Sequence, residues 1–448
     1  MIYPHNASRS AVNKYLGHVW NSHADALIWV AVIAAFVPVL LMRDFTPNNE
    51  GRYLIIADEA LHNRHFFSFT LHGEPYADKP PLYLWLVMLF GQLLGHHNMA
   101  ALGLLSLLPA CGVVQRMNVL CRDILSPSVR RTATLMLMTT AYFAGPAMVV
   151  RMDMLMCLFI VLALGTFWQM YRAETVSHRH QWLMGLWLFL ALFTKGPLGL
   201  LIPIVTIVVF AATYRLTCRL GQWLNWRMWL VLLVGCAIWF TMAYHEAGGS
   251  YLYNLLFHQT VGRGFRAFHH ARPFYYYLIS LWYEWLPWSL LCVAAMVFTA
   301  TRYRRVDALP RFLFIMTLTT LVLLSAISGK LQVYLLPAFP FVVYLAAWAM
   351  MGDMPRRWTL WSLAVPQAVL TLVLPALLLA PTLAPLPMLM HPWLVAGASV
   401  LSLSAAAALY LLMGKADAER SVRVLAFGIL ATLLLGGMAM PTLNAIIH

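Results

Sequence analysis

The sequence predicts a polytopic, all-α membrane protein, because of its composition, its low charge and the length of its apolar runs. Of its 448 residues, 62% are hydrophobic and only 10% are charged, and the mean hydropathy is +0.73. Soluble chains carry about 25% charged residues and roughly 45–50% apolar ones. The apolar residues form continuous runs, whereas the strands of a membrane β-barrel alternate over about 10 residues. Helices are therefore the expected spanning elements.

Thirteen apolar runs are predicted to be transmembrane helices, each approaching the roughly 20 residues that cross a bilayer. In chain order they are 26–42, 100–115, 132–150, 154–170, 182–194, 198–213, 228–245, 276–300, 312–328, 333–351, 358–380, 392–413 and 424–446. The first run follows a polar opening of 25 residues, and no small-residue cleavage site comes after it. We therefore expect an uncleaved first span rather than a signal peptide.

Basic residues predict the orientation of these spans, because cytoplasmic loops carry an excess of Lys and Arg. If the N-terminus is cytoplasmic, 20 of the 30 Lys and Arg residues fall in the inner segments. Topology then explains most of the net charge of +14. Membrane lipids are expected partners, and nucleic acid is not.

The apolar stretch Leu82–Leu94 is predicted to lie along the outer membrane surface as a juxtamembrane helix. It has only 13 residues, which follow Pro80-Pro81 and precede Gly95. Counting it as a span would place the basic segment Arg116–Arg131 outside. Residues 43–99 are therefore expected to form one long extracytoplasmic loop.

Charges of both signs gather on the predicted outer side. Arg151, Asp153, Lys195 and Lys330 lie where an outer loop is almost missing, and others lie in the loop 43–99. A charge at the membrane edge is costly unless it is paired or used. Any one of them could be an interface anchor that snorkels to water. Because they come from several loops, we favour a pocket.

A pocket of carboxylates and cations suits a reaction in which a phosphate leaves. A carboxylate can act as a base or steady an oxocarbenium-like centre, and Lys or Arg can hold the departing phosphate. The chain contains no GxxxxGK[ST] motif and no strand-linked GxGxxG motif. A lipid-linked phosphate donor that enters from the bilayer is therefore the expected substrate.

Seven motifs along residues 26–340 resemble those of one enzyme family, in the same order. They are NNEGRYLIIADEAL (48–61), GEPYADKPPLYLWL (73–86), RMD (151–153), LFTKGPLGLLIP (192–203), HARPFYYYL (270–278), LPWSLL (286–291) and SGKLQVYLLPAFP (328–340). The family comprises bacterial lipid-linked-sugar glycosyltransferases related to 4-amino-4-deoxy-L-arabinose lipid A transferase and to protein O-mannosyltransferases. The resemblance implies a GT-C fold with juxtamembrane helices in the first outer loop.

The resemblance also implies a function and a location. The expected enzyme moves a sugar from a polyprenyl-phosphate donor to a glycolipid of the lipid A or lipopolysaccharide type, or to a protein. Its active site is expected to face the periplasm from the bacterial inner membrane. Residues 1–350 are expected to form the catalytic core, and 351–448 further membrane helices without the soluble periplasmic domain that larger family members carry.

Site residues follow from the same motifs. Glu50 matches the second acid of the family's Asp-Glu pair, while Asn49 stands where the first acid, the usual catalytic residue, would be. Either Glu50 or Asp153 is then the catalytic acid, or the acceptor is already an anion and needs no base. The expected substrate-binding residues are Arg52, Tyr53, Asp78, Lys79, Lys195, His269, His270, Arg272, Lys330 and Tyr334, with Lys79 expected to hold the donor phosphate.

No cofactor is expected from the sequence. The six cysteines are scattered, which predicts neither disulfides nor a cysteine metal site. The pairs His62/His65 and His96/His97 could bind a divalent metal. They lack a third ligand at clear spacing, so a metal site is only a minor alternative.

Two other classes of function compete with the transferase. A flippase or transporter of lipid-linked sugars would place charges near mid-span and repeat broken helices in both halves. The chain shows no such repeat, and its charges gather at one edge. A non-catalytic scaffold would not need Lys79, Asp153, Lys195 and Lys330 together.

Overall fold

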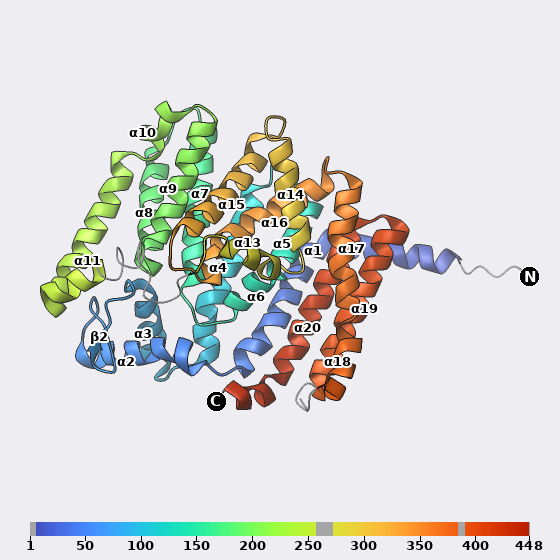
Figure 1. Ribbon diagram of the computed structural model, residues 1–448, viewed down its shortest axis with the longest axis horizontal. Coiled ribbons are helices and arrows are strands. Elements are labelled where there is room, and N and C mark those ends of the chain that lie inside the picture. The colour runs from blue at the N-terminus through green and yellow to red at the C-terminus, as the bar shows by residue number, and fades with distance from the viewer. Residues whose placement is uncertain (1–5, 257–271, 384–389, 448) are drawn as a thin grey trace, which may run out of the picture.

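The computed structural model describes residues 6–256, 272–383 and 390–447, and these residues are almost entirely helical (Figure 1). The long helices are α1 Asn6–Met42, α4 Met99–Leu120, α7 Asp153–Arg172, α8 His178–Lys195, α9 Leu198–Thr213, α11 Trp226–Tyr253, α15 Ala308–Ala326, α17 Arg356–Thr371, α19 Pro392–Lys415 and α20 Ala418–Ile447. Shorter helices are α2 Arg52–Asn63, α3 Leu82–Leu94, α5 Pro127–Met138, α6 Ala141–Ala147, α10 Leu220–Trp223, α13 Tyr276–Glu284, α14 Ser289–Thr301, α16 Phe339–Met351 and α18 Val373–Leu383. The remaining elements are the π-turn η1 Pro47–Gly51, the 3-10 segments η2 Thr217–Arg219 and η4 Gln332–Ala338, and the strands β1 Thr70–Leu71 and β2 Glu74–Pro75.

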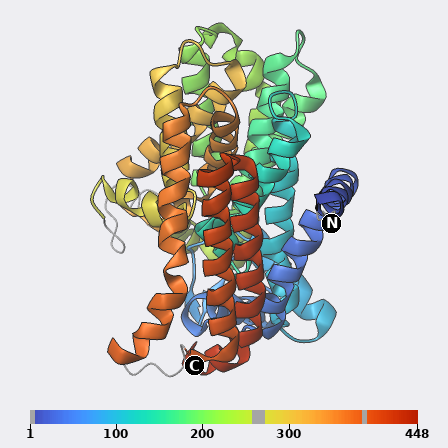
Figure 2. The same ribbon diagram turned by 90° about the vertical axis from the view of Figure 1, so that its right-hand side faces the viewer.

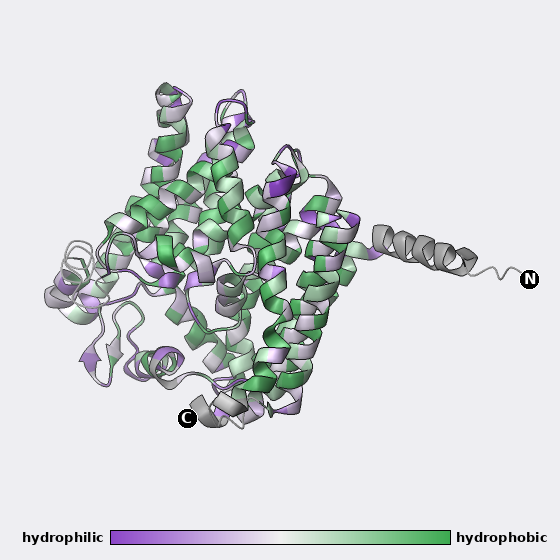
Figure 3. Ribbon diagram, turned by 45° about the vertical axis from the view of Figure 1, so that its right-hand side comes forward, coloured by the Kyte–Doolittle hydropathy of each residue, from purple (hydrophilic) through white to green (hydrophobic). Residues whose placement is uncertain are grey.

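The predicted all-α membrane fold is confirmed, and the chain is a multi-pass membrane protein. Among the described residues, nine helical segments are long and apolar enough to cross a bilayer, and three shorter apolar helices accompany them. Hydrophobic residues colour these helices along most of their length, whereas hydrophilic ones gather in the turns and around the hairpin (Figure 3). The most enclosed spans are α7 and the segment η4–α16, so the core of the bundle lies there.

Several predicted spans are divided into shorter elements, among them 358–380, which becomes α17 and α18. The run 132–150 becomes α5 and α6, and the break falls at Thr139 and Thr140. Both hydroxyls donate to carbonyls of the preceding turn, on Leu135 and Met136. Side chains that bond in this way compete with the helical ladder and bend it. The run 276–300 becomes α13 and α14, separated by a turn at Leu286-Pro287.

Helix α3 has the bounds that the sequence predicts. It follows two prolines, whose fixed φ suits the start of a helix, and it ends at Gly95, whose φ of +70° favours glycine. Its 13 residues extend about 20 Å, less than the roughly 30 Å of a hydrocarbon core. In Figure 1, α2, α3 and the hairpin lie together at one end of the bundle, while η2 and α10 lie at the other.

A two-stranded hairpin projects from residues 43–99, which are called the outer element from here on. His72 and Gly73 both have positive φ, as a tight type I′ turn requires. The Glu59 carboxylate on α2 accepts hydrogen bonds from the Thr70 hydroxyl and from the backbone N–H groups of His72 and Gly73. The Thr70 hydroxyl lowers the pKa of Glu59 most, and the backbone donors lower it further. Glu59 therefore fixes the hairpin to α2.

The chain between α2 and the hairpin is anchored to α11. Glu246 accepts hydrogen bonds from the backbone N–H groups of Phe66, Phe67 and Ser68 at 2.8–2.9 Å, and from the Ser68 hydroxyl at 2.9 Å. Two residues later, Gly248 has a φ of +75° and kinks α11. One carboxylate thus connects a membrane helix to the outer element.

Replacing Glu246 with Ala is expected to loosen residues 64–69. Leaving several N–H groups without an acceptor costs about 2 kcal/mol, which raises the locally opened fraction about 30-fold. Trypsin should then cleave after Arg64 correspondingly faster in the purified protein. Glu174→Ala, which removes an exposed acid between α7 and α8, is the control. Equal cleavage of both variants would contradict the anchoring role.

The C-terminal helices support the beginning of the outer element. Helices α19 and α20 lie side by side, and α20 packs along α1 (Figure 2). Near the end of α20, the Asn444 amide donates to the Met42 carbonyl at 2.8 Å, and its oxygen accepts from Asp44 N–H at 3.2 Å. The end of α1, where the outer element starts, is therefore fixed by the C-terminal helix.

Candidate active site

Asp153 is the centre of the charged cluster. It begins α7, and its side chain is only 1% exposed. One carboxylate oxygen accepts from Arg151 Nε at 3.0 Å, and the other accepts from the ammonium of Lys195. Because Lys195 is the last residue of α8, the pair joins the start of one helix to the end of the next. Two cations thus compensate a carboxylate that burial would otherwise destabilise.

Lys195 connects this pair to two other parts of the chain. Its Nζ lies 4.4 Å from the ring centroid of Tyr334 on η4, a cation–π distance. The charges of Arg151, Lys79 and Asp78 also act on the ammonium. The structure therefore brings together five of the residues predicted from separate motifs: Asp78, Lys79, Asp153, Lys195 and Tyr334.

The outer element contributes a chain of aromatic and charged groups. The Arg52 guanidinium lies 5.7 Å from the ring of Tyr53 and 5.9 Å from that of Tyr76. The Tyr76 hydroxyl donates to Asp78 at 3.1 Å, and Asp78 pairs with Lys79 at 3.1 Å. Burial and the charge of Asp78 raise the pKa of Tyr76, so its hydroxyl stays a donor. Arg52, Tyr53 and Lys79 thus lie along one path.

Glu50 is fully buried, and its carboxylate is surrounded by donors. Arg43 donates twice, at 2.5 and 2.8 Å, Thr46 donates from its N–H and its hydroxyl, and Val150 N–H donates at 2.7 Å. Burial raises the pKa of Glu50, but the Arg43 and backbone hydrogen bonds outweigh it and the pKa is lowered. Since Val150 precedes Arg151, Glu50 fixes η1 against the segment that leads to Asp153.

Asn49 lies beside Glu50 in η1 but is exposed. Its backbone N–H donates to the Thr46 carbonyl at 3.3 Å, the same residue that contacts Glu50. The π-turn therefore directs two adjacent residues differently, with Glu50 buried in the protein and Asn49 exposed at its surface. Of the predicted pair, Asn49 is the residue accessible to a substrate.

Arg272 and Lys330 meet at a second place in the fold. The Lys330 ammonium donates to the Arg272 carbonyl at 3.2 Å and to the Ile327 carbonyl. The Arg272 N–H donates to the Ser328 carbonyl at 3.3 Å, while its side chain is exposed. Lys330 therefore holds two chain segments together, four residues before Tyr334. The predicted His269 and His270 lie outside the described residues.

Two charged residues of this region were not among the predicted site residues. Arg43 is the main partner of Glu50, and its only signal in the sequence is that it follows the first span. Glu284 on α13 is fully buried, and within the described part of the chain neither carboxylate oxygen has a hydrogen-bond partner. The charges of Glu284 and Arg151 both act on Tyr142. An acid inside the aromatic run 274–288 was the available signal.

The histidine pairs near α2 and α3 were the reason for the metal alternative. Among the side chains that the structure describes, no three His, Cys, Asp or Glu residues are grouped to hold an ion. His97 Nε2 is 2.7 Å from an Asp58 oxygen, and His96 Nδ1 is 2.9 Å from the Leu94 carbonyl. These two histidines therefore stabilise the end of α3.

No protein-family model matches the chain. Over 342 residues, 74% of its length, it is 27% identical to an undecaprenyl phosphate-alpha-4-amino-4-deoxy-L-arabinose arabinosyl transferase of Pseudomonas fluorescens. Over 319 residues, 70% of its length, it is 25% identical to a transferase of the same name from Shewanella sediminis. The chain spans 57% of the length of each of these relatives.

A solved structure extends the likeness to almost the whole chain. ArnT from Cupriavidus metallidurans, in a crystal structure with bound undecaprenyl phosphate, matches with a TM-score of 0.79 at 21% identity, covering 95% of this chain and 78% of that one. The apo form of the same protein matches with a TM-score of 0.77. The chain thus has the GT-C fold of ArnT, and its predicted resemblance to the lipid-linked aminoarabinose transferases is confirmed.

Proposed function

We propose that this protein is a glycosyltransferase that moves a sugar from a polyprenyl-phosphate donor to a lipid A-type glycolipid or a protein. The observation that carries the proposal is the buried Asp153–Lys195 pair, with Arg151, Asp78 and Lys79 around it. Cations held in place by a carboxylate are suited to stabilising the charge that develops on a departing phosphate. The relatives, by their names, use an undecaprenyl-phosphate-linked sugar, and this supports the same donor class here.

Each residue then has a role in the proposal. Lys79 and Lys195 hold the donor phosphate, and Asp153 keeps Lys195 and Arg151 in position while serving as the candidate base. Arg52 and Tyr53 extend the binding surface along the outer element, and Arg272 supplies a further cation. His269 and His270, which lie outside the described residues, keep their predicted role in substrate binding.

The proposed site faces the periplasm from the inner membrane of a bacterium. The positive-inside distribution of Lys and Arg supports this orientation. The segment of η2 and α10, which was predicted to be a basic inner segment, lies at the end of the bundle opposite α2 and α3. Residues 1–350 form the catalytic core in this proposal. Residues 351–448 support the core, as the contact between Asn444 and Met42 illustrates.

Mass spectrometry of lipids from cells with and without the protein tests the function. A transferase acting on lipid should, when absent, leave a sugar-linked polyprenyl monophosphate in excess and remove one glycolipid that is heavier by a single sugar. If the acceptor is a protein, the same donor should accumulate while a glycoprotein loses one sugar mass. A carrier trapped on one leaflet would instead support a flippase, and unchanged donor, lipids and proteins would contradict the proposal.

Replacing Asn49 with Asp is expected to reveal the type of acceptor. If the acceptor is a hydroxyl, a carboxylate at this exposed position adds a general base, and turnover should rise about 10-fold or more. If the acceptor is already an anion, the added charge repels it, and turnover should fall. Transfer rates of purified wild type, Asn49→Asp and Asn49→Gln check this prediction. An identical rate in all three would place residue 49 outside the reacting centre.

A further inference from the structure

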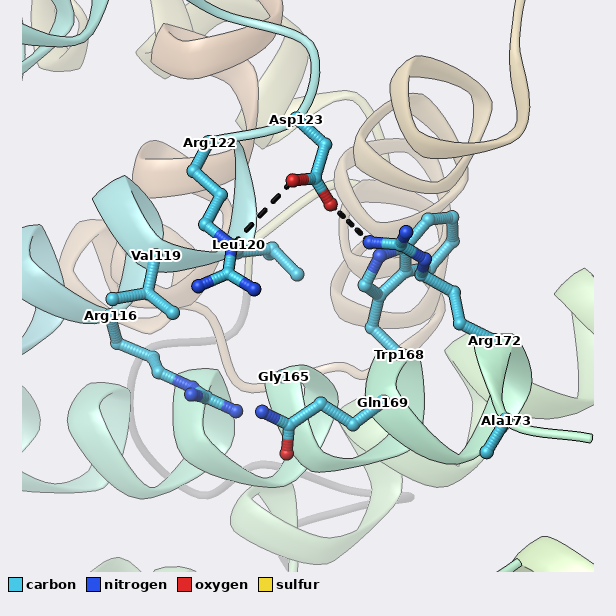
Figure 4. Close-up of a pocket in the computed structure, with 10 residues that line it drawn as sticks. All are labelled: Arg116, Val119, Leu120, Arg122, Asp123, Gly165, Trp168, Gln169, Arg172 and Ala173. Atoms are coloured by element: carbon cyan, nitrogen blue, oxygen red, sulfur yellow. Dashed lines mark hydrogen bonds and ion pairs between the residues drawn. The ribbon is translucent and has the colours of Figure 1, made fainter. Parts of the chain in front are cut away.

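A second group of cations lies at the opposite end of α7 from Asp153 (Figure 4). Its residues come from the last turns of α4, the turn that follows, and the last turns of α7. They line a cavity of about 390 Å³, to which Arg116, Arg122, Asp123, Trp168, Gln169 and Arg172 contribute the polar side chains. Arg172 is 19 residues along the helix from Asp153, which at 1.5 Å per residue is about 28 Å. The cavity is therefore separate from the candidate active site and lies at the proposed cytoplasmic side.

The charge of this cavity is not balanced by its own residues. Asp123 is shared by two arginines: it pairs with Arg122 at 3.5 Å and with Arg172. Arg116 is the third cation of the lining, and Figure 4 shows its guanidinium directed toward the Gln169 amide. Three cations and one carboxylate leave an excess of two positive charges around one opening.

Two donors in the lining are buried and lack an acceptor within the described part of the chain. They are Arg116 Nε and Trp168 Nε1, and Trp168 is only 6% exposed. A buried donor without an acceptor costs about 1–3 kcal/mol, so such groups are usually satisfied by a water, an ion or a ligand. Positive-inside topology explains arginines at this end, but it does not explain a buried indole N–H beside them.

Gly165 makes room for the Arg116 guanidinium. A Cβ at position 165 would lie 2.5 Å from Arg116 Nε and 2.8 Å from one of its terminal nitrogens. The guanidinium therefore lies against the backbone of α7, where only glycine allows it. This close approach holds one cation of the cavity in a defined position rather than leaving it to extend into water.

We propose that this cavity binds a phosphate group through Arg116, Arg122 and Arg172, with Trp168 Nε1 as an additional donor. Guanidinium groups match phosphate oxygens in geometry and charge. Basic pockets between membrane helices on the cytoplasmic side are suited to the head groups of anionic phospholipids. Free phosphate from the cytoplasm has the same chemistry, and the experiment distinguishes the two sources.

The test measures thermal unfolding of the purified protein in detergent with four additives. These are cardiolipin, phosphatidylglycerol, phosphatidylcholine and inorganic phosphate. We expect the two anionic lipids to raise the unfolding temperature, by an amount that levels off as the lipid concentration increases. Phosphatidylcholine should leave the unfolding temperature unchanged. Stabilisation by inorganic phosphate at least as strong as that by lipid would also support the site and would assign its source to the cytoplasm.

Variants link any stabilisation to the cavity. Gly165→Ala displaces Arg116 without changing a charge, and Arg116→Gln removes the charge. Each variant should raise the additive concentration needed for half of the maximal stabilisation about 10-fold or more. The control is Arg356→Gln with Arg357→Gln, which removes two exposed cations at the start of α17. Equal binding by all variants, or no stabilisation by any anion, would overturn the proposal. Neither result would bear on sugar transfer, which is measured separately.

Discussion

Replacing Lys195 with Met is expected to lower sugar transfer about 100- to 1,000-fold, as when one preorganised donor is lost from an active site. The same change leaves Asp153 buried, with Arg151 as its remaining ion-pair partner among the described residues. Breaking a buried pair by removing one partner costs about 3–5 kcal/mol, so the variant should also unfold at a lower temperature. Transfer by purified protein and thermal unfolding are the two measurements.

A double variant separates these two effects. Asp153→Asn combined with Lys195→Met removes both charges, so most of the lost stability should return. Transfer should stay low, because the cation beside Tyr334 is still missing. Lys415→Met, at an exposed position in the last turn of α19, is the matched control and should change neither property. Recovery of transfer in the double variant would show that the pair serves stability alone.

The sequence predicted the fold because the relevant signals are local. Apolar length predicted thirteen spans, of which the described residues give nine segments long and apolar enough to cross a bilayer. The two prolines with Gly95 gave α3 its bounds. The breaks in the runs 132–150 and 276–300 were not predicted. At Thr139 and Thr140 the cause is side-chain bonding to the preceding carbonyls, which composition does not reveal.

The site was predicted in part, because motifs identify residues but not their partners. Asp153 and Lys195 are 42 positions apart, and only tertiary packing brings α7 and α8 together so that the two meet. Glu50 depends even more on distant residues, since its Val150 donor is 100 positions away. The motif offered Glu50 as a candidate catalytic acid next to Asn49, and only the fold shows that Glu50 is buried while Asn49 is exposed. The roles assigned to all these residues stay predictions.

The position of Glu50 leads to the second large expected effect. Glu50→Gln should lower transfer strongly and also destabilise the outer element. A glutamine offers one acceptor oxygen, and its NH₂ group would face Arg43, Thr46 or Val150, all of which donate to Glu50. The loss of hydrogen bonds to a buried charge costs about 3 kcal/mol. Glu74→Gln, an exposed acid of the hairpin, is the control.

The pH dependence of unfolding adds an independent check on Glu50. Its pKa in the folded protein is lowered from the ordinary value of 4.5, so its contribution to stability is complete above that pH. This contribution is lost as the pH falls through the lower, folded pKa. Wild type should therefore lose stability below about pH 4.5 more steeply than Glu50→Gln, which lacks the titrating group. Parallel curves for the two proteins would contradict the ion pair with Arg43.

Arg43→Gln decides between a positioning role and a catalytic one. If Glu50 positions η1, removing Arg43 should reproduce the defects of Glu50→Gln, because the carboxylate loses its two shortest side-chain contacts. If Glu50 is the base, the loss of Arg43 raises the carboxylate pKa and strengthens it as a base. Transfer by Arg43→Gln would then survive, with its pH profile shifted upward. Since every oxygen of Glu50 already accepts from Arg43, Thr46 or Val150, we expect the first outcome, and with it a positioning role for Glu50 beside the exposed residue 49.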